Sequence, residues 1–265
     1  MSNKTIAVVT GGAGDIGRAI ASALAETHDI IFVVDIDRSK LLKTPGEISE
    51  RGSHGVNKFM TCYCDITKEE DVANMAKSVS SHGRVRTLIN NAGATNVGSL
   101  GEMTPTAWKG DISLNLNASF FCFHAFEESL KETRGSVVNI ASGNGLGVFG
   151  NPAYSAAKAG LIHFTRSIAV EYGKFGVRAN CVAPGTVRTG AWKEKAAANP
   201  GVFDEAMKWY PLQRGIEPRD IARAVAFLVN DELAGAITGI CLPVDCGLIA
   251  GQPALARTFG QSDNY

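Results

Sequence analysis

The sequence predicts a single α/β domain built on a parallel β-sheet. Three observations lead to this prediction. Short apolar segments rich in β-branched residues alternate with helical segments, a Gly-rich turn follows the first apolar segment, and polar residues follow several others. With 265 residues, of which 45% are hydrophobic and 20% charged, the chain suits one large domain of this kind. We expect this domain to span residues 1–250, followed by a C-terminal tail at 251–265.

Charge and cysteine content exclude several classes of function. Lys and Arg together number 26, as do Asp and Glu, so we expect neither a nucleic-acid nor a membrane partner. The apolar stretch near the N-terminus is too short for a signal peptide or a membrane span. The six cysteines form no CxxC pair and have no histidines at metal-ligand spacing, which predicts buried thiols, a cytoplasmic protein and no metal site.

The chain begins with the pattern of a dinucleotide site. An apolar strand is expected at Thr5–Val9, and the turn T-G-G-A-G-D-I-G at Thr10–Gly17 leads into a helix that reaches Leu24. Glycines in such a turn let the backbone approach a diphosphate, and the helix N-terminus supplies N–H groups and a positive dipole end. A second apolar strand, Ile30–Val34, gives this Gly-rich turn the context that a nucleotide site requires.

Asp35 sets the expected cofactor preference. It ends the second strand, eighteen residues after Gly17. A carboxylate in this place can accept hydrogen bonds from ribose hydroxyls and would repel a 2′-phosphate, so we predict NAD rather than NADP. Arg38 lies close enough in the sequence to favour the opposite preference. The structural alternative is that Asp35 and Asp37 only open a surface turn.

Two further strands complete the first half. Pro45-Gly46 predicts that the helix after the second strand is short or broken. A third strand at about 58–64 ends at Asp65-Ile66, where Asp65 can accept from an adenine amino group or cap the next helix. The fourth strand, Thr87–Ile89, runs into N-N-A-G at Asn90–Gly93, where small residues allow the backbone to lie against a cofactor.

The second half adds polar residues at the same edge of the sheet. Helices are expected at Pro105–Leu114 and Asn115–Lys131, and Asn115 at their junction either holds a distorted backbone and a water or simply caps the helix. A fifth strand, Gly135–Ser142, brings Ser142 to the carboxyl edge. Parallel sheets bind their ligands at this edge.

Tyr154 and Lys158 form the most suggestive pair in the chain. They lie four residues apart at the start of a predicted helix, Pro152–Tyr172, and therefore on one face of it. A cation beside a phenol lowers its pKa and makes tyrosine an acid–base catalyst, while Ser142 can polarise a carbonyl. Without further context, a solvated surface pair explains the same spacing.

The remaining segments are expected to close the site. A sixth strand, Val177–Ala183, leads into P-G-T-V-R-T at Pro184–Thr189, which can hold a nicotinamide amide or be an ordinary turn. The aromatic-rich segment at about 190–211 is interpreted as a flap over the substrate. A helix at Asp220–Val229 and a last strand at Ile240–Val244 follow.

Together these motifs resemble the short-chain dehydrogenase/reductase family, in its common short form, over about 4–247. The resemblance implies a Rossmann-type, doubly wound sheet of seven parallel strands with helices on both faces. It implies an NAD(H)-dependent oxidoreductase that moves a hydride between nicotinamide and a small secondary alcohol or ketone, such as a polyol, sugar-like compound or hydroxy acid. The implied catalytic residues are Asn115, Ser142, Tyr154 and Lys158.

In that scheme Tyr154 exchanges the hydroxyl proton and Ser142 holds the substrate oxygen. Lys158 binds the nicotinamide ribose and lowers the pKa of Tyr154, and Asn115 keeps a water relay in place. The expected cofactor-binding residues are Gly11, Gly14, Asp15, Ile16, Gly17, Asp35, Asp65, Ile66, Asn91, Ala92, Gly93, Tyr154, Lys158, Pro184, Gly185, Val187 and Thr189. The expected substrate-binding residues are Ser142, Asn144, Phe149, Tyr154, Trp192 and Trp209.

Two departures from the family pattern stand out. Asp15 replaces the glycine of the common short members, and we expect its side chain to turn to solvent at the helix start, where the helix dipole favours it. The spacing through Gly14 and Gly17 also matches the family's extended branch, which keeps an NAD-retaining epimerase or dehydratase as an alternative. The gap from Ser142 to Tyr154 is one residue shorter than usual, which alters the Gly-rich substrate loop.

The sequence leaves open one alternative function and the oligomeric state. A non-catalytic NAD-binding regulator is the remaining alternative function, and an intact set of catalytic residues disfavours it. The resemblance also suggests a homo-oligomer, either a tetramer or a dimer, and apolar residues such as Phe120 and Phe164 support it weakly. The tail is expected to be polar and mobile, with Phe259 and Tyr265 able to dock on a neighbour.

Overall fold

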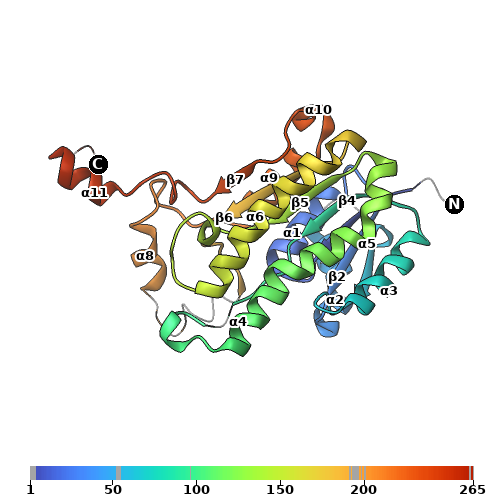
Figure 1. Ribbon diagram of the computed structural model, residues 1–265, viewed down its shortest axis with the longest axis horizontal. Coiled ribbons are helices and arrows are strands. Elements are labelled where there is room, and N and C mark those ends of the chain that lie inside the picture. The colour runs from blue at the N-terminus through green and yellow to red at the C-terminus, as the bar shows by residue number, and fades with distance from the viewer. Residues whose placement is uncertain are drawn as a thin grey trace.

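A seven-stranded parallel sheet forms the centre of the molecule, in the order β3-β2-β1-β4-β5-β6-β7 (Figure 1). The computed structural model describes residues 4–51, 55–95, 97–190, 192, 197, 199, 201–262 and 264. The predicted fold class and number of strands are confirmed. The strands are β1 (Thr5–Thr10), β2 (Ile30–Asp35), β3 (Phe59–Tyr63), β4 (Arg84–Asn90), β5 (Ser136–Ile140), β6 (Arg178–Pro184) and β7 (Cys241–Val244).

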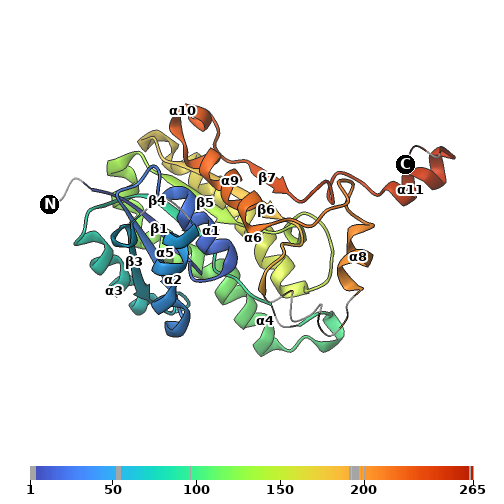
Figure 2. The ribbon, with the colours of Figure 1, turned by 180° about the vertical axis from the view of Figure 1, so that it is seen from behind.

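Helices cover both faces of the sheet, with α3, α5 and α6 on one face and α1, α2 and α9 on the other (Figures 1 and 2). The helices α1–α5 are Asp15–Leu24, Arg38–Arg51, Glu69–Ser80, Pro105–Ile112 and Ala118–Thr133. The helices α6 and α8–α11 are Pro152–Tyr172, Val202–Met207, Pro218–Val229, Asp231–Ala234 and Pro253–Gly260.

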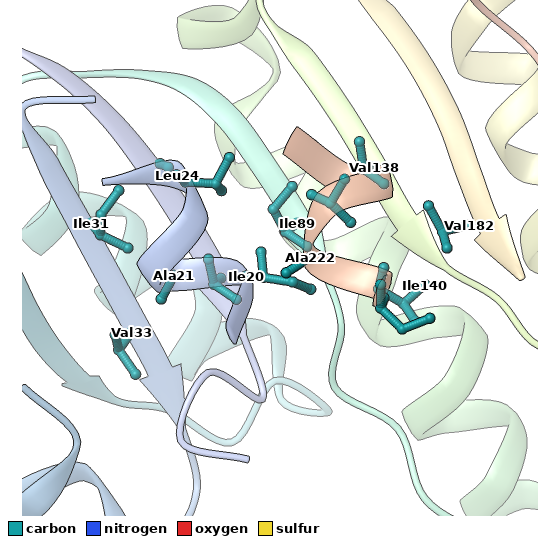
Figure 3. Close-up of a cluster of buried hydrophobic side chains, with 14 of the residues drawn as sticks. Ile20, Ala21, Leu24, Ile31, Val33, Ile89, Val138, Ile140, Val182 and Ala222 are labelled. Carbon is teal, nitrogen blue, oxygen red and sulfur yellow. The ribbon is translucent and has the colours of Figure 1, made fainter. Parts of the chain in front are cut away.

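Side-chain alternation along the strands produces two cores. In β1, Ile6 and Val8 pack beneath α3 and α5, while Ala7 and Val9 pack beneath α1 and α9, and all four are fully buried. Figure 3 shows the second of these cores, where α1 and Ala222 of α9 meet residues of β2, β4, β5 and β6. Both faces of the sheet are buried, and the polar side chains within its strands, such as Asn139 and Asn180, are buried with it.

The helix α2 differs from the prediction, because it runs unbroken through Pro45. Its start is fixed by Asp37, whose Oδ1 accepts hydrogen bonds from the N–H groups of Ser39 and Lys40. Leu41 and Ile48 are buried on either side of the proline. Packing of both turns against the sheet therefore compensates for the backbone hydrogen bond that Pro45 cannot donate.

The C-terminal tail contains a helix, α11, beyond β7. Pro253 occupies its first turn, a favourable position for proline, and Leu255 and Phe259 are exposed on it. Figures 1 and 2 show α11 at the end of the molecule remote from the N-terminus. No helix among the described residues is long and apolar enough to cross a membrane.

Candidate active site

The Gly-rich turn between β1 and α1 is closely packed backbone. Gly11 has a φ of +59°, and a Cβ on it would lie 2.8 Å from Ala92 Cα. A Cβ on Gly17 would collide with the Gly11 carbonyl oxygen and lie 2.6 Å from Gly12 Cα. These glycines let α1 begin directly against the turn, with its N-terminus at the carboxyl edge of the sheet, as a diphosphate site requires.

The segment after β4 is tied to the same turn. Asn91 Nδ2 donates to the carbonyl oxygens of Thr10 and Gly11, both at 3.0 Å. The Thr10 hydroxyl oxygen accepts from the N–H groups of Asn91, at 3.1 Å, and Ala92, at 3.2 Å. The predicted residues Asn91 and Ala92 therefore hold the turn from the side of β4, whereas Gly93 lies against Asn115 and Lys158.

At the end of β2, Asp35 joins the Gly-rich turn. Its Oδ2 accepts from Ala13 N–H at 3.1 Å and its Oδ1 from Asp37 N–H at 3.0 Å. The guanidinium of Arg38 stacks over the ring of Tyr63, 3.7 Å from the ring centroid. The Asp35 carboxylate is thus held at the edge, while Arg38 is engaged by a neighbouring strand.

Asp65 and Ile66 follow β3, the edge strand of this half of the sheet. Asp65 Oδ1 accepts from the Thr67 hydroxyl, at 2.6 Å, and from Thr67 N–H, at 3.1 Å, which lowers the pKa of the carboxyl group. This closes the turn before α3, but Asp65 does not cap that helix: α3 begins at Glu69, and no side chain caps it at its N-cap residue, Lys68. Ile66 is buried in the core beneath α3, with 9% of its surface exposed.

Asn115 lies in a π-helical turn, Ser113–Asn117, between α4 and α5. Its Nδ2 donates to the carbonyl oxygens of Asp111, at 2.9 Å, and Ala94, at 2.8 Å. Its Oδ1 is buried and has no hydrogen-bond partner among the described residues. The distorted backbone that we predicted at this asparagine is present, and it leaves a buried acceptor directed at Gly93, where a Cβ would lie 2.7 Å from it.

Lys158 is the buried cation of the site, with 2% of its surface exposed. Its Nζ donates to the Ile140 carbonyl oxygen at 2.7 Å, at the end of β5. Burial lowers the pKa of Lys158 to about 8. The Nζ atom lies 5.5 Å from the ring centroid of Tyr154, so helical spacing does place the two side chains together.

The pKa of Tyr154 is raised, which differs from our expectation. Burial raises it, and the hydrogen bond with Ser142 lowers it by less. The reason is that Lys158 is directed to the Ile140 carbonyl oxygen and is itself desolvated, so it favours the phenolate too weakly to offset the burial of Tyr154.

Ser142 follows β5 and is positioned by the Gly-rich loop. Its Oγ accepts from Asn144 N–H at 3.2 Å. The Asn144 side chain donates to the carbonyl oxygen of Gly150, at 3.0 Å, and to the Ser155 hydroxyl, at 3.1 Å. The predicted substrate residue Asn144 therefore also holds the shortened loop against the start of α6.

A narrow cavity of about 200 Å³ connects these groups with the cofactor turn. It is lined from the side of α1 by Ile16 and from the loop after β6 by Pro184, Gly185, Val187 and Thr189. Lys158, Tyr154 and Ser142 lie along the same cavity. The residues predicted to hold the nicotinamide end are thus brought together.

A larger cavity of about 860 Å³ opens beside it, and all six predicted substrate residues line it. Ser142 and Tyr154 line both cavities and stand at their junction. The structure adds Thr186, Tyr210, Leu248 and Gln252 to the wall of the larger cavity. The Tyr210 hydroxyl accepts a hydrogen bond from Thr186 N–H and donates one to the Thr186 hydroxyl oxygen. The two residues are 24 positions apart, so no local sequence pattern predicts this contact.

The predicted flap lies only partly within the described residues. Residues 191, 193–196, 198 and 200 of this segment lie outside them. Trp192 contacts Phe203 with ring centroids 5.7 Å apart, and Tyr210 is buried in the core rather than covering the cavity. No group of His, Cys, Asp and Glu within the part of the chain that the structure describes could hold a metal ion.

The orientation of Asp15 was predicted wrongly. Its Oδ2 accepts from Gly190 N–H at 2.7 Å, and its Oδ1 pairs with Arg18 at 2.6 Å. The side chain turns toward the loop after β6, because two donors, one of them 175 residues away, face it there, while 31% of it stays exposed.

Comparison with known proteins agrees with this geometry. A family model described as enoyl-(acyl carrier protein) reductase matches residues 11–249. An uncharacterized oxidoreductase of Schizosaccharomyces pombe is 34% identical, covering 98% of this chain and 97% of its own. The BbsD subunit of (2S)-[(R)-hydroxy(phenyl)methyl]succinyl-CoA dehydrogenase from Thauera aromatica is 35% identical, with coverages of 91% and 95%.

Solved structures are similar over the whole chain. A crystal structure of an oxidoreductase of the short-chain dehydrogenase/reductase family from Burkholderia thailandensis has a TM-score of 0.88 and 36% identity, and covers 100% of both chains. A structure of ElxO with NADP bound has a TM-score of 0.85 and 26% identity, and covers 94% of this chain and 100% of its own.

Proposed function

Because the chain belongs to the short-chain dehydrogenase/reductase family, we propose that this oxidoreductase transfers a hydride between NAD(H) and a small secondary alcohol or ketone. The observation that carries the proposal is the junction of the two cavities. Ser142 and Tyr154 border both the narrow cavity that begins at the Gly-rich turn and the wide one that can hold a substrate. A carbonyl at this junction reaches both hydroxyl groups.

The residues present fit a nicotinamide cofactor. The glycines of the turn leave room at the N-terminus of α1, Asn115 offers an unpartnered buried oxygen, and Gly93 leaves space where a Cβ would lie 3.2 Å from Lys158 Nζ. When bound, the nicotinamide supplies or accepts the hydride, which is chemistry that no side chain provides.

The side chains then manage the proton. Tyr154 donates its phenolic proton to the substrate oxygen in reduction, and accepts a proton from the hydroxyl in oxidation. Ser142 orients that oxygen by a hydrogen bond. The ammonium of Lys158 lies 5.5 Å from the centroid of the Tyr154 ring, where it favours the phenolate form. A second cation or a ribose hydroxyl near the ring would favour the phenolate further. Asn115 Oδ1 can accept from a water that leads protons from Lys158 toward solvent.

The preference for NAD rests on Asp35 and Arg38. Asp35 keeps a negative charge at the place where an adenosine 2′-phosphate would lie, and Arg38 is stacked on Tyr63. Some neighbours of this fold bind NADP, and ElxO is one, so the preference must be measured for this chain. An enzyme that turns over only with NADP(H) would refute it.

Tyr154→Phe tests the chemistry directly. We expect kcat to fall about 1000-fold or more with NAD affinity unchanged, because the variant loses only the proton donor. A panel of hydroxyacyl thioesters, polyols, hydroxy acids and cyclic ketones supplies the substrates. A variant that is as active as the wild type on any of these would rule out the proposed role of Tyr154.

We further propose a cytoplasmic homo-oligomer, either a dimer or a tetramer. All six cysteines are free, which suits a reducing compartment. Phe120 is 48% exposed on α5 beside a groove of about 810 Å³ between α3 and α5, with His124 stacked on it. Light scattering tests the assembly, and Phe120→Asp should lower the mass if α5 lies in an interface.

A further inference from the structure

One carboxamide ties the Gly-rich loop after β5 to the start of α6. Asn144 Nδ2 donates to the carbonyl oxygen of Gly150 at 3.0 Å and to the Ser155 hydroxyl oxygen at 3.1 Å. The Ser155 hydroxyl donates in turn to the same Gly150 oxygen at 2.8 Å. Both hydrogens of the Asn144 amide nitrogen therefore have an acceptor, and this arrangement determines which way the carboxamide faces.

The backbone before α6 is shaped to offer this acceptor. Gly150 and Asn151 both have a positive φ, +82° and +51°, so the chain turns sharply before the helix begins at Pro152. Asn151 N–H donates to the Gly98 carbonyl oxygen at 2.9 Å and holds the turn in place. The Gly150 carbonyl oxygen therefore faces the loop, where it accepts two hydrogen bonds from side chains.

The other side of Asn144 faces Ser142. Ser142 Oγ accepts from Asn144 N–H at 3.2 Å, and Asn144 Oδ1 lies 3.5 Å from the same oxygen. A separation of 3.5 Å is too long for a strong hydroxyl hydrogen bond, so the Ser142 proton stays available to Tyr154 or to a substrate oxygen. The N–H group belongs to the backbone, whereas the Asn144 side chain determines where this part of the backbone is held.

The two ends of the Asn144–Ser155 contact lie next to the two catalytic hydroxyl groups. Asn144 follows Ser142 by two residues, and Ser155 follows Tyr154 by one. Tyr154 belongs to a helix of 21 residues that packs a row of buried side chains, whereas Val148 of the loop is 94% exposed. If the contact is lost, the loop with Ser142 should therefore move, while the helix with Tyr154 stays in place.

We propose that Asn144 is a positioning residue that holds the Ser142 hydroxyl at a fixed separation from the Tyr154 hydroxyl. It acts through its contacts with Ser155 and Gly150. This role rests on the proposed function, since the separation matters only if both hydroxyls bind the oxygen of one substrate. A displaced Ser142 misaligns that oxygen and slows the bound substrate more than it weakens binding. Asn144 also lines the large cavity, so direct contact with the substrate is the alternative that an experiment must separate.

Steady-state kinetics of Asn144→Ala and Ser155→Ala test this role, with NAD and the alcohol of the panel that the wild type oxidises fastest. Ser155 is not among the described residues that line the large cavity, so its variant separates positioning from substrate contact. We expect kcat to fall about 30-fold for Asn144→Ala and about fivefold for Ser155→Ala, with KM and NAD affinity changed less than about twofold. Ser155→Thr, which keeps the hydroxyl, should retain the wild-type rate.

The pH profile and a double mutant show whether the effect passes through Ser142. The hydrogen bond with Ser142 lowers the pKa of Tyr154, so displacing Ser142 should move the rise of kcat with pH in alcohol oxidation to higher pH, as Ser142→Ala does. Lys158, the cation beside the ring, is unchanged in every variant. In the Ser142→Ala background, Asn144→Ala should lower kcat by less than about twofold, because no hydroxyl remains to be positioned.

Ser167→Ala is the matched control, because Ser167 lies further along α6 and its hydroxyl donates to the His163 carbonyl oxygen of the same helix at 3.5 Å. It should change none of these quantities. An unchanged kcat in Ser155→Ala, or a loss in Asn144→Ala that is equally large without the Ser142 hydroxyl, would overturn the positioning role alone. If Asn144→Ala does not fold, Ser155→Ala takes its place in the double mutant and the pH profile. A wild type without NAD-linked activity on any alcohol of the panel would overturn the proposed function, and the positioning role with it.

Discussion

The cofactor side and the substrate side of the cleft are built differently. On the cofactor side, backbone packs on backbone: Gly11, Gly17 and the segment after β4 approach one another so closely that single methyl groups would collide. On the substrate side, the cavity is walled by loops, and Val148, Phe149 and Trp209 on it are 94%, 46% and 55% exposed.

The fold determines the conformation of the turns on the cofactor side, whereas the loops on the substrate side can vary. Turns anchored at the ends of buried parallel strands have few alternative conformations, because both the strands and the following helices are fixed by the core. Loops that contact solvent on one side can change sequence at little cost in stability. Mutations should therefore damage binding and folding together on the cofactor side, and substrate selection alone on the other.

The largest effect is expected from Gly17→Ala. The new Cβ would overlap the Gly11 carbonyl oxygen and lie 2.6 Å from Gly12 Cα, so α1 must shift away from the turn. We expect a loss of about 3 kcal/mol in the free energy of unfolding and about 100-fold weaker NAD binding. Urea denaturation and calorimetry measure the two quantities.

Gly14→Ala is the control for this variant. Gly14 lies in the same turn, but its backbone is extended, and a Cβ there would lie 3.4 Å from Gly11 O, an ordinary contact. It should leave stability and NAD affinity nearly unchanged. If both substitutions lowered stability and NAD affinity equally, the whole turn would be sensitive to substitution, and not only the close approach of Gly17 to Gly11 and Gly12.

The next largest effect is a loss of stability in acid. His28, just beyond α1, is buried, and its Nε2 hydrogen-bonds with Thr87 of β4 at 2.8 Å. Burial lowers its pKa from 6.5 to about 4, so the unfolded chain binds the proton more readily between these values. The stabilisation by neutral His28 is complete above pH 6.5 and is lost as the pH falls toward 4, by roughly 3 kcal/mol in all.

Urea denaturation of the wild type and of His28→Gln at pH 7 and pH 4.5 measures this contribution. The difference in stability between the two pH values should be smaller in the variant, because glutamine does not titrate. An identical pH dependence in both proteins would mean that other groups cause the acid sensitivity.

The same division explains which features were predictable from sequence. Asn115, Ser142, Tyr154 and Lys158 were found from local motifs, and the structure brings them to one edge because strand ends and helical spacing are local properties. The orientation of Asp15 was not predictable, since its partner Gly190 is 175 residues away. The prediction of a broken helix at Pro45 was wrong for the same reason. Leu41 and Ile48 of α2 are buried, and their packing against the rest of the core outweighs the local effect of the proline.

The pKa of Tyr154 shows a further limit. Sequence spacing places Lys158 beside Tyr154, but the direction of the shift depends on burial and on the Ile140 carbonyl oxygen that Lys158 contacts. Sequence spacing predicts which side chains lie close together. How far each of them is desolvated depends on the packing of the whole structure.

Gly145→Ala is the counterpart of Gly17→Ala on the substrate side. A Cβ at Gly145 would lie 2.9 Å from the carbonyl carbon of Lys158 and 3.0 Å from Ala159 N, so the loop must move away from α6. We expect KM for the substrate to rise about tenfold with NAD affinity unchanged. Steady-state kinetics and calorimetry measure this, and Gly101→Ala, where a Cβ meets nothing within 4 Å, is the control. If Gly145→Ala also lowered NAD affinity, the cofactor side and the substrate side would not respond to mutation independently.

The smallest effect is expected from Trp209→Ala. Trp209 lines the large cavity while 55% of its surface is exposed, so it contributes little to folding. A substrate that covers the indole would lose about 1 kcal/mol of binding in the variant, or roughly fivefold in kcat/KM, with the melting temperature preserved. The loss should grow with the apolar size of the substrate, because a larger substrate covers more of the ring. A loss that is equal for small and large substrates would show that Trp209 does not select between them, and would leave that selection to other residues of the cavity wall, such as Val148 and Phe149.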